Sequence, residues 1–183
     1  MKTTRLLKST AAVIALALLA SCGGGDDTNA DKNKKNEGSA FPASLISDKP
    51  IEGAVGVVAA RAAGKSGEPI VLRGKVGGVD PALSEAAAIF VLADEKAITS
   101  CDDIHGDDCP TPWDYCCEDP DKKKASIATI QIVDADGKVI RKGLRGFGGI
   151  KELSRVIISG TVDKASTPEN MIVNASTIHV EKP

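Results

Sequence analysis

The chain has 183 residues and a formal net charge of −2; 42% of its residues are hydrophobic, but only 3% are aromatic. This length suits one domain, whose core must be built from Val, Ile, Leu and Ala, because few aromatic rings are available. This slightly negative net charge gives no electrostatic case for nucleic-acid binding, so we predict no nucleic-acid partner.

The first 21 residues have the composition of a secretory signal. Three basic residues precede the apolar stretch 11–20, and the sequence Leu-Ala-Ser-Cys at 19–22 closes it. The stretch is about half as long as the roughly 20 residues of a membrane-spanning helix, so we expect it to be cleaved. The run ending at Cys22 resembles the lipobox of bacterial lipoproteins. This resemblance implies that Cys22 is acylated, as by palmitate, and begins a mature protein anchored outside the cytoplasm; ordinary secretion with cleavage elsewhere is the alternative.

Residues 22–49 are predicted to be a flexible tether that starts at the lipid. Residues 23–40 mix Gly, Asp, Asn and Lys without a large apolar side chain, so they cannot bury enough surface to order themselves. Gly23 follows the cysteine where an Asp would signal retention in the inner membrane. By resemblance to lipoprotein sorting in double-membraned bacteria, this implies an outer-membrane anchor facing the periplasm.

Residues 50–183 are predicted to form one mainly β domain. A helix is expected over 54–63, ending at Gly64. Short β-branched runs bounded by Gly, Pro, Asp or Asn then predict strands at 70–77, 87–93, 126–133, 155–162 and 171–180. Because no helices alternate with these strands, the pattern predicts a small all-β barrel or sandwich.

Details of the strands favour a barrel. Gly74, Gly77 and Gly78 would let the first strand bend and join both sides of a barrel. The last two strands are predicted to form a closing hairpin whose connection contains Pro168 and Asn170. Together with the final Ile-x-Val triplet, this pattern resembles the OB-fold over residues 69–181. The resemblance implies a five-stranded barrel and carries no activity with it.

Three Gly-containing segments are interpreted as ordinary connections. Asp134 to Gly137 is typical of a hairpin turn, since the glycine comes fourth and a calcium loop needs it sixth. Gly64-Lys65-Ser66 is not a P-loop, because Ala59 stands where the motif requires its first glycine. The run 143–149 is predicted to connect two strands, although nearby basic residues leave an anion site as the alternative.

The unusual chemistry lies in a long insertion, about residues 94–125, between the second and third strands. Residues 101–121 hold four cysteines, eight carboxylates, one histidine, the only Trp and the only Tyr, and no basic residue. A loop this long is usually functional or cross-linked, and we expect it to lack a core of its own. Its sequence CPTPWDYCC resembles insertions in bacterial lipoproteins that have an OB-like core, a family that implies no activity.

The cysteines of the insertion have three interpretations. Disulfides are favoured because, once Cys22 carries lipid, the remaining number is even and the compartment is oxidising. Adjacent Cys116 and Cys117 are too close to bond each other. Two connectivities remain: Cys101 with Cys116 and Cys109 with Cys117, or the crossed pairing. Thiol redox chemistry is the least favoured, because nearby carboxylates disfavour a thiolate.

The remaining interpretation of the cysteines is a zinc or copper site. Its ligands would come from Cys101, His105, Cys109, Cys116 and Cys117. Against it, the chain has no CxxC pair, and adjacent cysteines are awkward corners of a tetrahedron.

The function predicted from these features is binding and not catalysis. His105 and His179 are the only histidines, and no serine elbow or HExxH motif is present, so no catalytic residue is assigned. Trp113, Asp114 and Tyr115 are candidates for a contact surface; alternatively, Trp113 is a hydrophobic anchor of the loop. We therefore predict a membrane-anchored, non-enzymatic binding or scaffold module without a cofactor, whose partner is an envelope protein or glycan. The alternative is a periplasmic metal-binding lipoprotein that uses the Cys/His loop.

Overall fold

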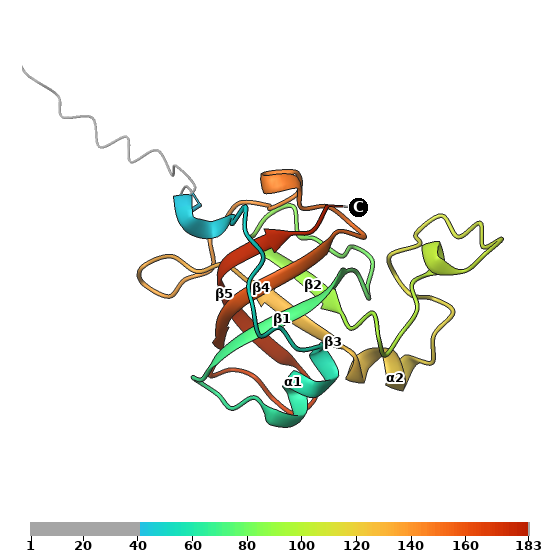
Figure 1. Cartoon of the computed structure of the whole chain (residues 1–183), viewed down its shortest axis with the longest axis horizontal. Helices are drawn as coiled ribbons and strands as arrows, with labels where there is room; N and C mark the ends of the chain where they lie inside the picture. The colour runs from blue at the N-terminus through green and yellow to red at the C-terminus, as the bar shows by residue number, and fades with distance from the viewer. Residues whose placement is uncertain (1–40, 183) are drawn as a thin grey trace, which may run out of the picture. The chain divides into compact units, whose positions relative to one another are not determined.

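The computed structural model describes residues 41–182 (Figure 1). The predicted signal at 1–21, the lipidation of Cys22 and the tether up to residue 40 lie outside these residues. Among the helices that the structure describes, none is long and apolar enough to cross a membrane.

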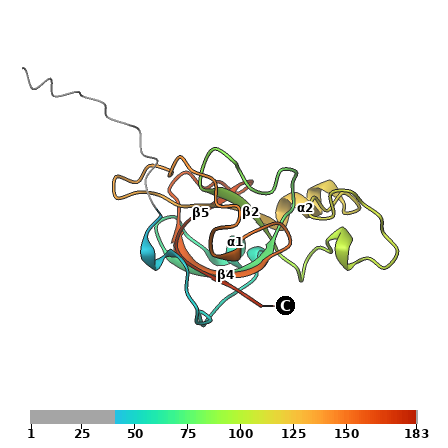
Figure 2. The same cartoon turned by 90° about the horizontal axis from the view of Figure 1, so that it is seen from above.

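The described residues form a closed five-stranded β-barrel with strand order β1-β2-β3-β5-β4, which Figure 2 shows nearly end-on. All neighbouring strands are antiparallel except β3 and β5, which are parallel. The strands are β1 (Pro69–Val76), β2 (Ile89–Ala93), β3 (Ile127–Gln131), β4 (Arg155–Val162) and β5 (Met171–Val180). The predicted fold class is confirmed: a small OB-like barrel is preceded by a short helix, α1 (Val57–Ala63), and carries a long insertion between β2 and β3.

The first strand closes the barrel, as its glycines predicted. β1 pairs with β4 from Pro69↔Thr161 to Lys75↔Arg155, and its last residues pair with β2. A Cβ at Gly74 would lie 2.3 Å from the carbonyl oxygen of Ala93, so only glycine allows the two strands to meet here. The strand can therefore serve both sides of the barrel.

The helix α1 begins at a cap supplied by a distant residue. The backbone N–H of Val58 donates to Asp94 Oδ2 at 2.9 Å, which satisfies one of the unpaired donors at the start of the helix. A Cβ on Gly56 would meet the same oxygen at 2.4 Å. The glycine before α1 therefore makes room for the Asp94 carboxylate. The buried side chains of Val57 and Ala60 pack the helix against the core.

The structure corrects the predicted start of the domain, because residues 41–49 do not belong to a tether. A short 3₁₀ helix at Ala43–Leu45 buries Leu45 completely, and Ile46 forms a parallel bridge with Ile178 of β5. The ring of Phe41 lies 4.6 Å from that of Phe147, centroid to centroid. This segment is hard to predict from the sequence, because Phe41, Leu45 and Ile46 are too few and too irregularly spaced to give a periodic signal. The barrel domain therefore includes the described residues from Phe41 onward.

Leu45→Ala is expected to lower the free energy of unfolding by about 2 to 3 kcal/mol, because it deletes fully buried methyl groups from a segment that can partly relax. Val58→Ala is the matched control: Val58 is 44% exposed, so its loss should cost less than about 0.5 kcal/mol. Urea unfolding followed by circular dichroism measures both. An equal, small effect at the two positions would show that residues 41–46 do not contribute to the fold.

The predicted connections are confirmed at two places. Asp134 N–H donates to the Lys138 carbonyl at 2.8 Å, and Gly137 adopts a φ of +77°, as the hairpin turn requires. The Gly-rich run connects β3 to β4. Its Arg145 pairs with Glu85 and Glu152, so the charge of this residue is compensated within the protein.

Candidate functional site

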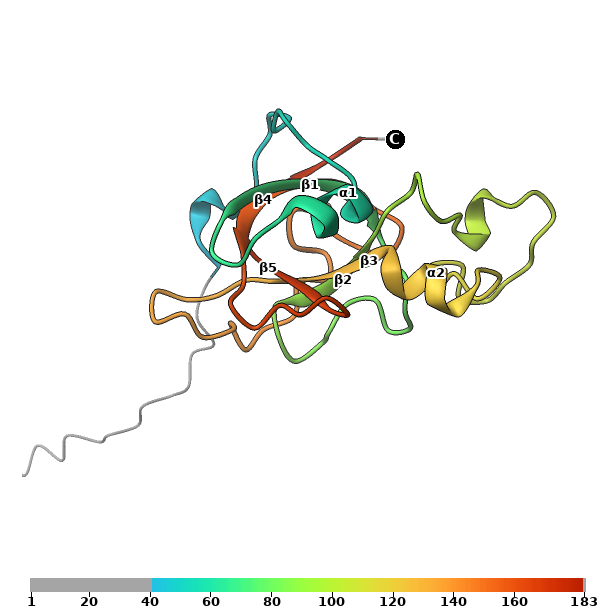
Figure 3. The same ribbon diagram turned by 90° about the horizontal axis from the view of Figure 1, so that it is seen from below.

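The insertion packs on the outside of the barrel over β1, β2 and β3. Figure 3 shows it projecting from one side of the barrel. Lys75, Ala93 and Ile127 are neighbours across the three strands, and their side chains point away from the barrel interior. Ile98 and Tyr115 of the insertion cover them and form a second hydrophobic cluster with Ala93 and Ile127. The expectation that the insertion lacks a core is therefore wrong.

A buried lysine joins the insertion to β1. Lys75 Nζ donates to Ser100 Oγ at 2.7 Å and to carboxylate oxygens of Asp102 and Asp103 at 2.9 Å. The Lys75 side chain is 2% exposed, whereas those of the two aspartates are 32% and 42% exposed. The hydrogen bond from Lys75 lowers the pKa of Asp103 below its usual value. Because the short helix Cys101–Asp103 contains both aspartates, this contact also fixes the position of Cys101.

Tyr115 is buried and cannot belong to a contact surface, which corrects that prediction. Its side chain is fully covered, its ring lies against Gly77, and its φ is +57°, a left-handed conformation that is rare for a bulky residue. Its hydroxyl has no hydrogen-bond partner, and burial raises the pKa of this hydroxyl. Tyr115 is thus the main hydrophobic anchor of the insertion.

Trp113 is half-buried and holds the insertion to the start of the β1–β2 connection. Its Nε1 donates to Asp80 Oδ1 at 3.1 Å, and its carbonyl accepts from the backbone N–H of Gly78 at 2.7 Å. These contacts agree with the alternative interpretation of Trp113 as an anchor. Asp114 is also half-buried, between Trp113 and Tyr115.

The end of the insertion is a short helix, α2 (Pro120–Ala125), which the sequence analysis did not predict. The carboxylate of Asp119 accepts from the backbone N–H groups of Asp121 and Lys122, and Pro120 occupies the first turn. A capping Asp, a Pro at the first helical position and three lysines in the last turn are ordinary signals for a helix. These signals were in the sequence and could have found α2. Lys123 also donates to the Asp114 carbonyl at 3.0 Å, which ties the helix to the loop.

The four cysteines of the insertion lie in one cluster centred on Cys116. The Cys116 sulfur is 3.5 Å from that of Cys109, 3.6 Å from that of Cys101 and 3.9 Å from that of Cys117. A disulfide requires about 2.05 Å, so neither predicted pairing is formed in the structure and all four are free thiols. Cys101 is buried, Cys109 is half-buried, and Cys116 and Cys117 are exposed.

The cluster divides the donors into two overlapping groups. In the first, the sulfurs of Cys101, Cys109 and Cys116 and a carboxylate oxygen of Asp114 all lie within 4.8 Å of one another. The second brings together Cys101, Asp107 and Cys117 within the same distance. His105 belongs to neither group and is exposed. The structure therefore does not bring His105 to the cysteines, and the other possible donors beside them are the carboxylates of Asp107 and Asp114.

Hydrogen bonds shift the pKa values of two thiols in the cluster in opposite directions. The backbone N–H of Thr111 is the main cause that lowers the pKa of Cys109. The pKa of Cys116 is raised, chiefly through its hydrogen bond to Cys109. Within this pair, negative charge is therefore favoured at Cys109 over Cys116.

The other candidate residues have structural roles. His179 Nδ1 is 2.8 Å from the Ser47 carbonyl oxygen, which fixes the segment before α1 to β5. Phe90, the aromatic residue of the predicted strands, is 1% exposed and lies in the core, where it cannot stack on a base.

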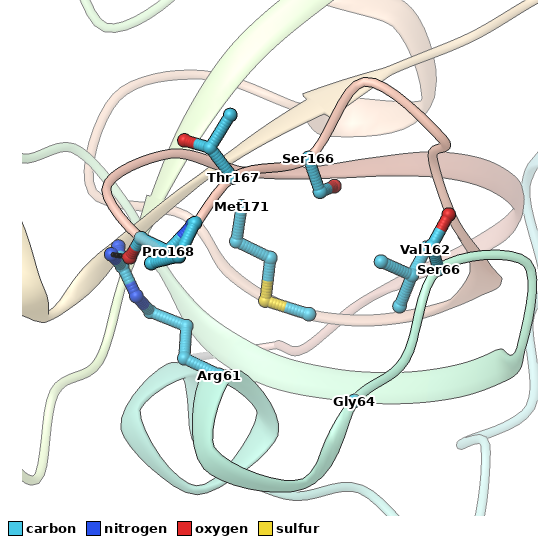
Figure 4. Close-up of a pocket in the computed structure, with 8 residues that line it drawn as sticks. All are labelled: Arg61, Gly64, Ser66, Val162, Ser166, Thr167, Pro168 and Met171. Atoms are coloured by element: carbon cyan, nitrogen blue, oxygen red, sulfur yellow. Dashed lines mark hydrogen bonds between the residues drawn. The ribbon is translucent and has the colours of Figure 1, made fainter.

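A separate cavity of about 270 Å³ lies between the end of α1 and the β4–β5 connection. Figure 4 shows Met171 pointing into it and Arg61 at its edge. The Arg61 guanidinium donates to the carbonyls of Lys124, Ile127 and Pro168, so its hydrogen-bonding capacity is largely used within the protein. The cavity is small for a ligand site, and it contains none of the predicted site residues.

No protein-family model matches the chain, and neither a curated protein nor a solved structure is significantly similar to it.

Proposed function

We propose that the protein is a lipid-anchored, extracytoplasmic binding module in which the barrel is the scaffold and the insertion is the binding part. The observation that carries this proposal is the ordered docking of the insertion. Its thiols and carboxylates are gathered at one place on the barrel through Tyr115 and the buried Lys75. Donor groups held in place before a ligand arrives bind it at a smaller entropic cost.

The anchor is Cys22, whose lipobox-like context supports export and acylation. The acid-rich insertion supports binding of a cation or of a basic surface on an envelope protein. A second candidate function is metal binding by a periplasmic lipoprotein. The group formed by Cys101, Cys109, Asp114 and Cys116 favours it, because it provides soft donors within reach of a single ion.

Replacing Cys22 by alanine is expected to release the full-length protein from the membrane. The experiment expresses the chain with its own signal in a double-membraned bacterium, supplies a labelled palmitate analogue and separates membrane from soluble fractions. The wild type should be labelled and sediment with membranes, whereas Cys22→Ala should be unlabelled and soluble. Cys117→Ala is the matched control, since it also removes one thiol but should leave the anchor intact. Membrane partitioning of signal-cleaved Cys22→Ala would overturn the proposal.

A further inference from the structure

We propose that Cys101, Cys109, Cys116 and Asp114 form a tetrahedral site for one zinc ion. This inference rests on the binding role proposed for the insertion and gives that role its ligand. It differs from the set expected from the sequence, because Asp114 replaces His105 and Cys117 is left outside the coordination shell.

The spacing of the donors fits one shared ion. Zinc binds thiolate sulfur at about 2.3 Å, which places sulfurs at the corners of a tetrahedron about 3.8 Å apart. Cys116 lies 3.6 Å from Cys101 and 3.5 Å from Cys109, sulfur to sulfur. Paired disulfides would instead bring each sulfur close to one partner only. Cys117 is 3.9 Å from Cys116, but only the sulfurs of Cys101, Cys109 and Cys116 share with an Asp114 oxygen a group whose members all lie within 4.8 Å of one another, as donors to a single ion must.

The insertion does not need cross-links to stay in place. The ion pairs of Lys75 with Asp102 and Asp103, and the hydrophobic cluster around Tyr115, already attach it to the barrel. Disulfides are thus not required to hold the insertion on the barrel. The thiols are therefore available for a ligand.

The carboxylate of Asp114 is held in position by its neighbours. One oxygen accepts from the Cys116 backbone N–H at 2.8 Å, and the other accepts from Thr111 Oγ1 at 2.9 Å. Contacts of this kind orient metal ligands and are as much a part of a metal site as the ligands themselves. The buried Tyr115 lies between Asp114 and Cys116, and its left-handed backbone turns both residues toward the cluster.

The chemistry of the set favours zinc over other ions. Three thiolates exclude calcium and magnesium, which take oxygen ligands. The carboxylate oxygen is a poor ligand for Cu(I), whereas zinc accepts Cys and Asp together. The carboxylates of residues 101–121 attract a cation, and the exposure of Cys116 gives the ion a way in.

Elemental analysis combined with thiol counting tests the site. The full-length protein is purified from membranes in detergent, without reductant or chelator, and its thiols are counted after denaturation. The expected result is one zinc per chain with the four cysteines of the insertion reduced. Four oxidised cysteines without metal, or copper in place of zinc, would overturn the inference.

Single substitutions test the ligand assignment. Reduced, metal-free protein is titrated with zinc against a chromophoric chelator, and with cobalt(II) to observe thiolate charge-transfer bands. Cys116→Ser should weaken zinc binding about 100-fold or more, because it removes a thiolate ligand. Asp114→Asn should weaken zinc binding about 10- to 100-fold. Loss of a residue that only orients a ligand should weaken zinc binding by no more than about 100-fold. Cys117→Ser, the matched control, should change it by less than about 10-fold. An equal loss for Cys117→Ser and Cys116→Ser would contradict the assignment.

Circular dichroism shows whether each variant is folded. If a variant unfolds, the cobalt(II) spectrum of the wild type still tests whether thiolates bind the metal. Cys116→Ser should still sediment with membranes, because Cys22 alone anchors the chain. Absence of zinc from a protein that is anchored would refute this site and leave the anchor proposal standing. Zinc binding by a protein that is not anchored would refute the anchor proposal and leave the zinc site standing.

Discussion

Replacing Asp102 and Asp103 together by asparagine is expected to lower the free energy of unfolding by about 3 to 5 kcal/mol. The reason is that the Lys75 side chain is 2% exposed and its ammonium has both carboxylates as counter-ions. The double substitution leaves a positive charge buried without compensation, and the protein must then open the insertion or bury a neutral lysine. Urea unfolding of the full-length protein measures the loss.

The loss of stability should be smaller when the lysine is replaced than when the two aspartates are replaced. Lys75→Met removes the buried charge, and the two aspartates can regain water because they are about a third exposed or more; we expect a loss of about 1 to 2 kcal/mol. The triple variant, with Lys75→Met added to both asparagines, should recover most of the stability that the double variant loses. If Lys75→Met alone destabilised more than the double variant, the buried ammonium would not be the dominant cost.

Proteolysis gives a second readout of the same contact. Trypsin cleaves after lysines, and α2 has three of them in its last turn. In the double variant the insertion should detach and these sites should be cut faster than in the wild type, while Lys75→Met should resemble the wild type more closely.

The barrel was predictable because its strands carry a local signal. Val, Ile and Leu alternate or run together within each strand, and Gly, Pro or Asp bounds it, so the positions of β4 and β5 agree at both ends with those expected. β2 and β3 are shorter than expected. Their apolar runs extend into connections where Ala87, Ala88 and Ile132 pack into the core without strand geometry.

The site was predictable only in part. Its amino-acid composition can be read from one stretch of the sequence, whereas the packing of the insertion on the barrel depends on residues far apart in the chain. The density of cysteines and carboxylates marked the insertion. Lys75, however, occupies an outward position in a strand, where a lysine usually faces solvent. Only the fold reveals that a segment more than twenty residues away along the chain covers it. His105 and Tyr115 were misjudged for the same reason, because sequence proximity to the cysteines says nothing about which side chain turns inward.

Tyr115 should respond in opposite directions to two substitutions. Tyr115→Ala is expected to lower the free energy of unfolding by about 3 to 5 kcal/mol, because it empties the centre of the cluster formed with Ala93 and Ile98. Tyr115→Phe keeps the ring and deletes a hydroxyl that is buried without a hydrogen-bond partner. Since a buried hydroxyl that is left unpaired costs about 1 to 3 kcal/mol, the Phe variant should be more stable than the wild type by about 1 kcal/mol.

The pair of variants separates the packing of Tyr115 from its chemistry. Urea unfolding of both variants beside the wild type gives the two differences, with an unchanged denaturant slope showing that the same surface is exposed on unfolding. A Phe variant less stable than the wild type would mean that the hydroxyl finds a partner, and Ser100, whose oxygen already binds Lys75, is the nearest candidate. A more stable Phe variant that binds zinc as well as the wild type would confine Tyr115 to a packing role. In that case its buried ring, together with Lys75, holds the cysteine cluster against the barrel, and the donors around Cys116 are ordered before any ligand arrives.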